Sequence, residues 1–353
     1  MKTQLFPFYF LILCNCTVSA QPSQSLQDPT LNNLVYPKEY KTCKLGELGA
    51  VVKTGSGKQS MILIPGLGFG SNEFKSFIHH YKDQYIIYTI TPAGFAGTPG
   101  PPMPDTSIKY IALTWTNGIV TGVLDLIEKE KLHKPIIVAS FVTATQVALD
   151  LAQDYPDEIS SIIIIGGSPY RFYPGQKKDG TYSDWENEIQ YTPEQRKKAI
   201  EFYWAPIWFK TVTKKTWDDN MWTPDDYCKD SIIGKQLFKT SAEVPVQVMI
   251  RYLIEWMAFD ANEKYKDIKV PALILIPDFK ELLAYNPKDT VSCRSYAAKI
   301  YLKYFHQKPW QKAKDSGNPL FTIQTVPDSR IFTWYDNPGA TYDLINGFIK
   351  KQK

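Results

Sequence analysis

Few side chains in this sequence are placed to do acid–base or nucleophilic chemistry. The chain has four His among 353 residues, and none follows His306. Ser140 and Thr143 carry hydroxyls at the end of an apolar run, although packing and helix capping are simpler roles for them. Asp278 follows another apolar run and is either an acid or a solvated loop carboxylate. A hydroxyl nucleophile needs a His base and an orienting acid, so these residues form a site only if the fold gathers them.

Apolar runs alternate with helical patterns over the first half of the chain. Near-continuous apolar or β-branched runs at 60–64, 85–91, 135–139 and 162–165 are typical of strands covered on both faces, and a weaker strand pattern covers 48–53. Helical patterns lie between them, at 106–131, at 145–155 and after Ser71, where Glu73 is expected on the exposed side. The alternation predicts an α/β fold with a mostly parallel central sheet and helices on both faces.

The alternation stops after the fourth buried run. Residues 169–268 show only helical and irregular patterns and hold six of the nine Trp. Strand patterns resume at 271–276 and 320–326, and a closing helix is predicted over 337–350. The domain organisation expected is one α/β core, built from 41–168 and 269–353, interrupted by a helical cap at 169–268.

This layout resembles the α/β-hydrolase family over roughly residues 45–350. Ile-Leu-Ile-Pro-Gly-Leu at 62–67 is similar to the strand and turn that supply one oxyanion-hole amide in that family. Thr-Pro-Ala-Gly-Phe-Ala-Gly at 91–97 resembles its Pro-Gly-Phe-Gly loop, in a form similar to one bacterial branch. Residues 135–156 resemble the nucleophile strand and the helix that follows it. The resemblance implies the α/β-hydrolase fold with a helical cap.

The family's nucleophile stands in a G-x-S-x-G elbow, a sharp turn flanked by small residues. Alignment of the strand and helix without a gap puts the elbow on 140–144, Ser-Phe-Val-Thr-Ala. The flanking positions stay small, but the nucleophile position holds Val142. We predict a strand that ends near Ser140, a turn at Val142 and a helix that begins by Thr145. A β-branched residue in this conformation costs on the order of 1–3 kcal/mol, so we expect the turn to be relaxed.

The family's base and acid positions also differ in this chain. Where the family often has Ala-Arg-His-Phe, residues 329–332 are Ser-Arg-Ile-Phe, so Ile331 holds the base position. The acid position falls on Lys280, two residues after Asp278. His306 reaches the sheet edge only if its segment folds back. The resemblance therefore implies substituted nucleophile and base positions, Val142 and Ile331, and leaves Ser140, Thr143 and Asp278 as alternative catalytic residues.

Backbone donors do not depend on side-chain identity, so the resemblance implies that the amides of Leu67 and Thr143 form an oxyanion hole. The family's pocket lies between cap and sheet. An aromatic content of 14% predicts a large core or an aromatic-lined cavity. Trp204 and Trp208 share one helix face and either line the pocket or pack the cap on the sheet. The candidate pocket residues are Phe69, Phe141, Trp204 and Trp208.

The amino terminus has the pattern of a secretory signal. A basic start precedes an apolar run at 5–13, and Val-Ser-Ala at 18–20 suits signal peptidase. We predict cleavage before Gln21, a flexible lead-in over 21–40 and a secreted or periplasmic protein. The run is shorter than the ~20 residues of a spanning helix, and no later segment could span a membrane. A lipoprotein is less favoured because neither Cys14 nor Cys16 follows a small residue.

Composition and cysteine spacing exclude other classes. The net charge of +4 is too small and too evenly spread to indicate nucleic acid or an anionic membrane surface as the partner. The mature chain keeps Cys43, Cys228 and Cys293, which allow at most one disulfide, of open pairing. No Cys or His spacing suits a metal, so no metal and no cofactor are expected. The oligomeric state is left open.

Three interpretations follow. The first is a hydrolase-like protein without Ser-His-acid machinery that binds a small, largely apolar molecule or a partner. The second is an active ester or acyl hydrolase, or an acid–base enzyme, that uses displaced residues in the same fold. The third is a purely structural surface protein with a collapsed cavity. A serine-directed fluorophosphonate labels the second kind of protein when a hydroxyl is the nucleophile.

Overall fold

The computed structural model describes residues 41–102, 110–170, 174–176, 183–188, 191–215, 217, 224–261, 264–283 and 301–352. The predicted signal and lead-in lie outside these residues, and so does Cys293. Cys43 and Cys228 are both unbonded thiols.

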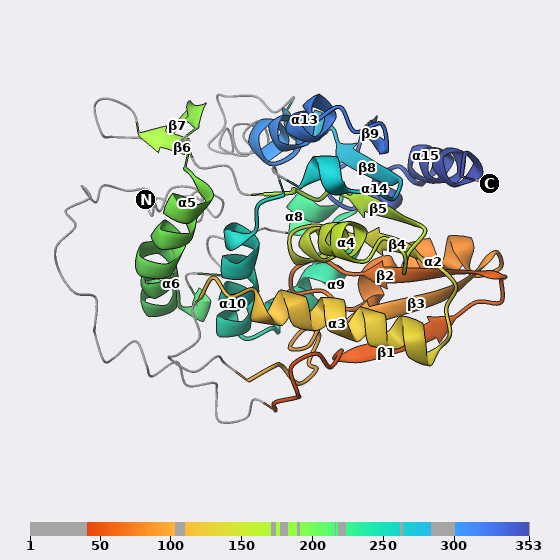
Figure 1. The fold of residues 1–353 in the computed structure, drawn as a ribbon, viewed down its shortest axis with the longest axis horizontal. Coiled ribbons are helices and arrows are strands. Elements are labelled where there is room, and N and C mark those ends of the chain that lie inside the picture. Colours follow the sequence, from red (N-terminus) through yellow and green to blue (C-terminus); the bar gives the residue numbers. More distant parts are fainter. Residues whose placement is uncertain are drawn as a thin grey trace.

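The predicted α/β sheet is confirmed. Its seven strands lie in the order β1-β3-β2-β4-β5-β8-β9 (Figure 1). β1 pairs antiparallel with β3, and the other pairings in this sheet are parallel. The strands are β1 Ala50–Thr54, β2 Gln59–Ile64, β3 Tyr85–Thr91, β4 Ile136–Ala139, β5 Ser161–Ile165, β8 Ala272–Pro277 and β9 Phe321–Val326.

Helices cover both faces of the sheet. Right-handed crossovers place α2 on one face and α3 and α4 on the other, because the chain crosses the sheet in opposite directions in these connections. α2 packs beside α15, where the rings of His80 and Tyr342 stack 3.8 Å apart, and α3 packs against α4. The helices are η2 Ser71–Phe74, α2 Lys75–Tyr81, α3 Thr114–Lys129, α4 Thr143–Asp154 and α15 Pro338–Lys350.

The helix predicted over 106–131 begins later than expected. Leu113 directly precedes α3 and has a left-handed conformation with φ 44, which an α-helix cannot continue through. The helix therefore begins at Thr114, and residues 103–109 lie outside the described residues.

The segment between β5 and β8 contains mostly helices. They are α5 Pro193–Ala199, η3 Ile200–Trp204, α6 Ala205–Thr211, α8 Pro224–Tyr227, α9 Ser231–Ala242, α10 Val246–Ala258 and η4 Tyr265–Asp267. It also holds a two-stranded sheet of β6 Pro174–Gln176 and β7 Ser183–Glu188, where only helical and irregular structure was predicted. β7 is Ser-Asp-Trp-Glu-Asn-Glu, whose lack of apolar alternation hides the strand.

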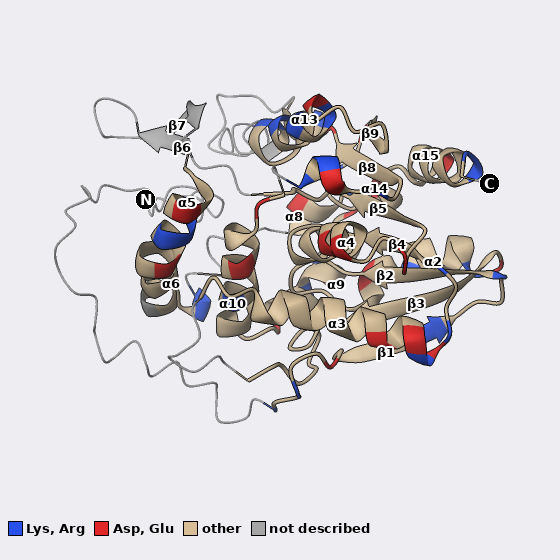
Figure 2. Ribbon diagram, viewed as in Figure 1, with Lys and Arg blue, Asp and Glu red and all other residues tan. Residues whose placement is uncertain are grey.

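The remaining helices precede or follow β9 in the chain. They are α11 Lys280–Leu283, η5 Tyr301–Gln307, α13 Lys308–Asp315 and α14 Thr333–Asp336. Charges of both signs share elements such as α5 and α13 (Figure 2). Within the described residues, no helix is long and apolar enough to cross a membrane.

Candidate functional site

The junction of β4 and α4 is a sharp turn centred on Val142. β4 ends at Ala139 and α4 begins at Thr143, as the register predicts. Val142 has φ 57 and ψ −112, a conformation that L-residues rarely adopt. The expected relaxation of this turn is therefore wrong, and the strain of about 1–3 kcal/mol is retained.

Close packing on two sides explains why the turn keeps this conformation. A Cβ added to Gly66 would lie 2.2 Å from the Phe141 ring, so Gly66 is the residue that lets the β2 turn and the elbow touch. On the other side, the Thr145 hydroxyl donates to the Ser140 carbonyl at 2.9 Å and fills the space beside Gly167. The surrounding turns thus fix the elbow backbone whatever side chain occupies its apex.

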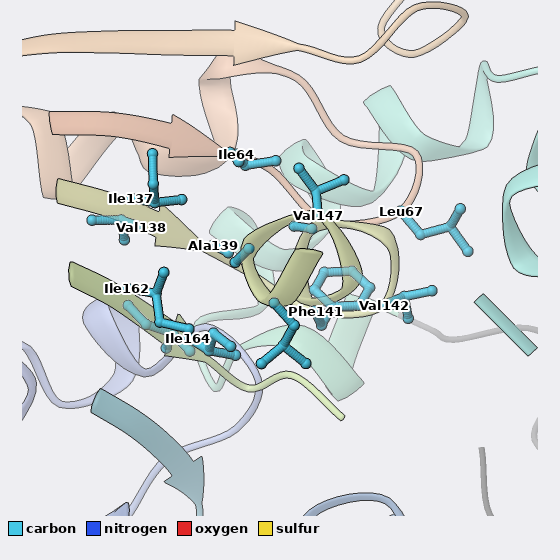
Figure 3. Packing of buried hydrophobic residues seen from close by; sticks show 14 of the residues in the cluster. Ile64, Leu67, Ile137, Val138, Ala139, Phe141, Val142, Val147, Ile162 and Ile164 are labelled. Carbon is cyan, nitrogen blue, oxygen red and sulfur yellow. The ribbon is translucent and has the colours of Figure 1, made fainter. Parts of the chain in front are cut away.

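The turn after β2 lies next to the elbow, at the carboxyl ends of the strands. Figure 3 shows Leu67 and Val142 extending beyond the strand ends on the same side, with Phe141 nearer the strands. The Leu67 amide has no hydrogen-bond partner among the described residues. Thr143 is the first residue of α4, so its amide has no partner within the helix. Neither amide therefore has a backbone acceptor among the described residues, and both residues are buried.

The predicted pocket aromatics lie in two different places. Phe69 and Phe141 are buried and pack edge to face, 5.8 Å between centroids. Both also contact the Tyr227 ring. Trp204 and Trp208 belong to η3 and α6, which pack against α10, and both are buried. Phe69 and Phe141 thus form one packed cluster beside the elbow, and the two Trp contribute to the packing of the helices between β5 and β8.

Ile331 is buried beside the end of β5, the strand next to β4 in the sheet. It is 1% exposed, and its backbone oxygen lies 2.8 Å from where a Cβ on Gly166, directly after β5, would be. The next residue, Phe332, donates its amide to the Tyr227 carbonyl at 2.8 Å, and the two rings stack 5.2 Å apart. The loop that carries Ile331 is thereby joined to α8. Sequence patterns gave no sign of Tyr227 or Phe332 in this role.

Asp278 lies close to this loop, and its carboxylate accepts hydrogen bonds from three backbone amides. One carboxylate oxygen accepts from Ser329 at 3.2 Å and Lys280 at 3.0 Å, and the other accepts from Asp328 at 2.9 Å. These bonds fix the turn two to three residues before Ile331. Asp278 therefore positions the loop, and Lys280 contributes its amide to the same arrangement.

His306 does fold back to the sheet edge. It is fully buried in η5, with Nδ1 3.3 Å from the Gly167 carbonyl oxygen. Burial lowers the pKa of His306 to about 3, so the ring is neutral and weakly basic. By contrast His79, His80 and His133 are exposed.

Glu73 is a site residue that the sequence pattern misplaced. It was expected on the outside of a helix, yet it is completely buried. The chain forms a tight 3₁₀ turn at 71–74 instead of a regular α-helix, and this turns the carboxyl inward, where Oε2 accepts from the Gly66 amide at 2.8 Å. Its neighbours Ser71, Asn72 and Lys75 are polar, so the local sequence gives no signal of burial.

Helix α10 crosses the same edge of the sheet and contacts three of its loops. Met249 packs at Gly68 of the β2 turn. The Tyr252 hydroxyl donates to the Ala93 carbonyl at 2.9 Å after β3. Trp256 Nε1 donates to the Ser168 carbonyl at 3.2 Å after β5. α10 therefore lies over the elbow region as a roof.

A buried carboxylate on α10 fastens this roof to α3 and pairs with an Arg on its own helix. Glu255 accepts from the amides of Trp115 and Thr116, the latter at 2.8 Å, and so caps the α3 amino terminus. Arg251 pairs with the same carboxylate at 2.8 Å, and both side chains are at most 2% exposed. Within the described residues, no group of three or more acidic, His or Cys side chains could hold a metal ion.

Comparison with known proteins identifies the fold. No protein-family model and no curated protein sequence matches the chain. An esterase from Thermogutta terrifontis matches with a TM-score of 0.52 at 13% identity, over 86% of this chain and 93% of its own. A meta-cleavage product hydrolase from Pseudomonas fluorescens matches with a TM-score of 0.53 at 12% identity, over 86% of this chain and 94% of its own. A hydrolase from Pseudomonas aeruginosa matches with a TM-score of 0.54 at 11% identity, over 85% and 93%.

At these identities the likeness shows the fold alone. The chain has the α/β-hydrolase fold, with a seven-stranded, mostly parallel sheet whose β1 is antiparallel. Its structural neighbours are esterases and other hydrolases.

Proposed function

We propose that this protein lacks Ser-His-acid catalysis and binds a small, largely apolar molecule at the carboxyl edge of its sheet. The observation that carries the proposal is Val142, which adopts φ 57 and ψ −112 at the apex of the elbow but has no atom that can attack a carbonyl. Ile331, at the position of the base, has no nitrogen that can take a proton. Without both groups, the attack of a serine oxygen on a carbonyl carbon with proton transfer to His, which begins acyl transfer, cannot take place.

The nearby hydroxyls are poor substitutes. Ser140 Oγ and Thr143 Oγ1 are buried and make no well-formed hydrogen bond among the described residues. The acid–base group beside Ser140 is the Glu73 carboxyl, which burial keeps mainly protonated at neutral pH, with a pKa of about 8. A general base must lie within hydrogen-bond reach of the proton that it takes. His306 directs Nδ1 at the Gly167 carbonyl, and its pKa of about 3 makes it a weak proton acceptor. The alternative of a hydrolase with displaced residues is therefore less favoured.

Two features support ligand binding. The Leu67 and Thr143 amides have no backbone acceptor among the described residues, and the side chains of Leu67 and Val142 next to them are apolar (Figure 3). In the organisation proposed, residues 41–168 and 269–353 form the core, and 169–268 form a cap that covers the ligand. The signal pattern at 1–20 supports export of the protein.

Ester turnover tests the catalytic half of this proposal. We expect purified protein to hydrolyse p-nitrophenyl acetate barely above the uncatalysed rate, with no change in Ser140→Ala or Thr143→Ala. Robust turnover that either variant abolishes would reject the proposal and favour the displaced-residue enzyme.

Direct binding of a fluorescent dye tests the proposed ligand site. We expect the apolar fluorophore 1-anilinonaphthalene-8-sulfonate to bind saturably to the folded protein, and Val142→Phe to abolish this binding by filling the site. Val52→Phe is the matched control, because Val52 lies on β1 and is 45% exposed. Equal dye binding by both variants, with native circular dichroism, would contradict a site at the elbow.

A further inference from the structure

Glu73 is a buried carboxyl at the meeting point of three turns. Its Oε2 accepts from the amide of Gly66, the residue directly before Leu67. Ser140, the first residue of the elbow, lies close enough to favour the ionised carboxyl, although neither Oε1 nor the Ser140 hydroxyl makes a well-formed hydrogen bond. Trp334 of α14 donates its Nε1 to the Glu73 carbonyl at 3.3 Å. One residue thus touches the β2 turn, the elbow and the loop element that follows Ile331.

Within the part of the chain that the structure describes, no cation compensates this carboxyl. The groups that favour its ionised form are the Ser140 hydroxyl and the Gly66 amide, both neutral. Tyr335 on α14 is the titratable side chain that faces Glu73, and its own pKa is raised in part by Glu73. α2 contributes the Ser76 hydroxyl, a neutral group near Tyr335 that makes no well-formed hydrogen bond. An ionised Glu73 is therefore a buried, unpaired charge, which is costly.

The protonated carboxyl fits this environment better. Burial raises the pKa of Glu73 to about 8 from an ordinary value of 4.5. At neutral pH the group is therefore mainly a neutral acid. Its Oε1–H can then donate to the Ser140 hydroxyl while Oε2 accepts from Gly66, which satisfies both turns at once.

We propose that Glu73 is a pH-sensitive clasp, whose protonated carboxyl ties the Leu67 turn to the Val142 elbow and whose ionisation loosens both turns. Deprotonation releases the proton to solvent and leaves an anion without a counter-charge between the turns. The folded clasp binds the proton more tightly than an opened one, so it is strongest below pH 4.5 and weakens as pH rises to about 8. The clasp operates whatever molecule the two turns bind.

Hydrogen exchange measured by mass spectrometry tests the clasp directly. Between pH 4.5 and about 8 the equilibrium constant for opening of the clasp rises about tenfold per pH unit. We therefore expect the hydrogen-exchange protection of residues 64–74 and 139–147 to fall roughly fiftyfold between pH 6 and pH 8, after correction for intrinsic exchange. Peptides from β8 serve as the internal reference. We expect Glu73→Gln, which mimics the neutral acid, to keep its protection at pH 8.

Two further variants complete the test. Glu130→Gln removes a half-buried carboxylate outside both turns and is expected to retain the wild-type pH response. Ser140→Ala removes the hydroxyl that accepts from the protonated Glu73, so residues 139–147 should lose their extra protection at low pH while residues 64–74 keep a pH response. pH-independent protection in the wild type, or a wild-type response in Glu73→Gln, would overturn the clasp. If Glu73→Gln does not fold, an unchanged response in Ser140→Ala overturns it instead. Ester turnover is not involved, so this result is separate from that of the proposed function.

Discussion

Glu255→Gln is a sharp test of how the α10 roof is held. In the wild type the Glu255 carboxylate accepts from Thr116 Oγ1 and from the Thr116 amide, both at 2.8 Å, and pairs with Arg251. The glutamine keeps the size and one acceptor oxygen but removes the charge. Arg251, whose side chain is 2% exposed, is then left as a buried cation without a counter-charge.

The expected loss is large for a single substitution. Breaking a buried ion pair from one side typically costs ~3–5 kcal/mol, because the remaining charge stays desolvated. Loss of the negative charge at the α3 amino terminus adds ~0.3–1 kcal/mol. We therefore expect Glu255→Gln to lower the free energy of unfolding by about 4 kcal/mol. Replacing both partners, with Arg251→Met and Glu255→Leu, should recover much of this loss.

Urea unfolding followed by Trp fluorescence measures the effect. Glu130→Gln is the matched control, since Glu130 also forms an ion pair beside α3 but with the exposed Lys53, and surface pairs contribute little. We expect no detectable change in the control. A loss below about 1 kcal/mol for Glu255→Gln, or equal effects of the two substitutions, would refute a roof fastened by this buried carboxylate.

Other substitutions probe the loop and the termini. Asp278→Ala should lower stability by about 2 kcal/mol in urea unfolding, because three amides lose their acceptor, and a fall in ester turnover instead would restore Asp278 as an acid. Val142→Ser should leave p-nitrophenyl acetate hydrolysis unchanged because Ile331 cannot activate the new hydroxyl, and a large gain would contradict this. Burial raises the pKa of Asp336 to about 6 from 3.8, so the free energy of unfolding should fall as pH rises through that window, and Asp336→Asn should flatten this part of the profile. Mass spectrometry of exported protein should find Gln21 as its first residue, and a lipidated Cys16 there would disprove the predicted cleavage.

The sequence predicts the sheet well because the information is local. Strand β3 matches the predicted 85–91 in full, since a strand buried on both faces needs a continuous apolar or β-branched run. The turn at Val142 follows from the register of two flanking patterns. In contrast, the polar strand β7 has no apolar alternation, and its pairing with β6 depends on chain geometry that composition does not encode.

The candidate site is less predictable because it depends on contacts distant in sequence. Glu73 has the appearance of an exposed helix residue until the 3₁₀ turn directs it at Gly66. Asp278 is next to the right loop, but its three backbone partners lie in two different segments. His306 reaches Gly167 only through the fold of η5 against β8. Such partners are set by tertiary packing, which local patterns do not specify.

The central claim is that Val142 leaves this α/β-hydrolase fold without a nucleophile. Intact-mass spectrometry of the purified protein after treatment with a serine-directed fluorophosphonate tests it most directly. Because neither Ser140 nor Thr143 makes a hydrogen bond to a His among the described residues, we predict that the mass remains that of the unmodified chain under conditions that label an active serine esterase completely. A stoichiometric phosphonyl adduct that maps to Ser140 or Thr143 would contradict the claim.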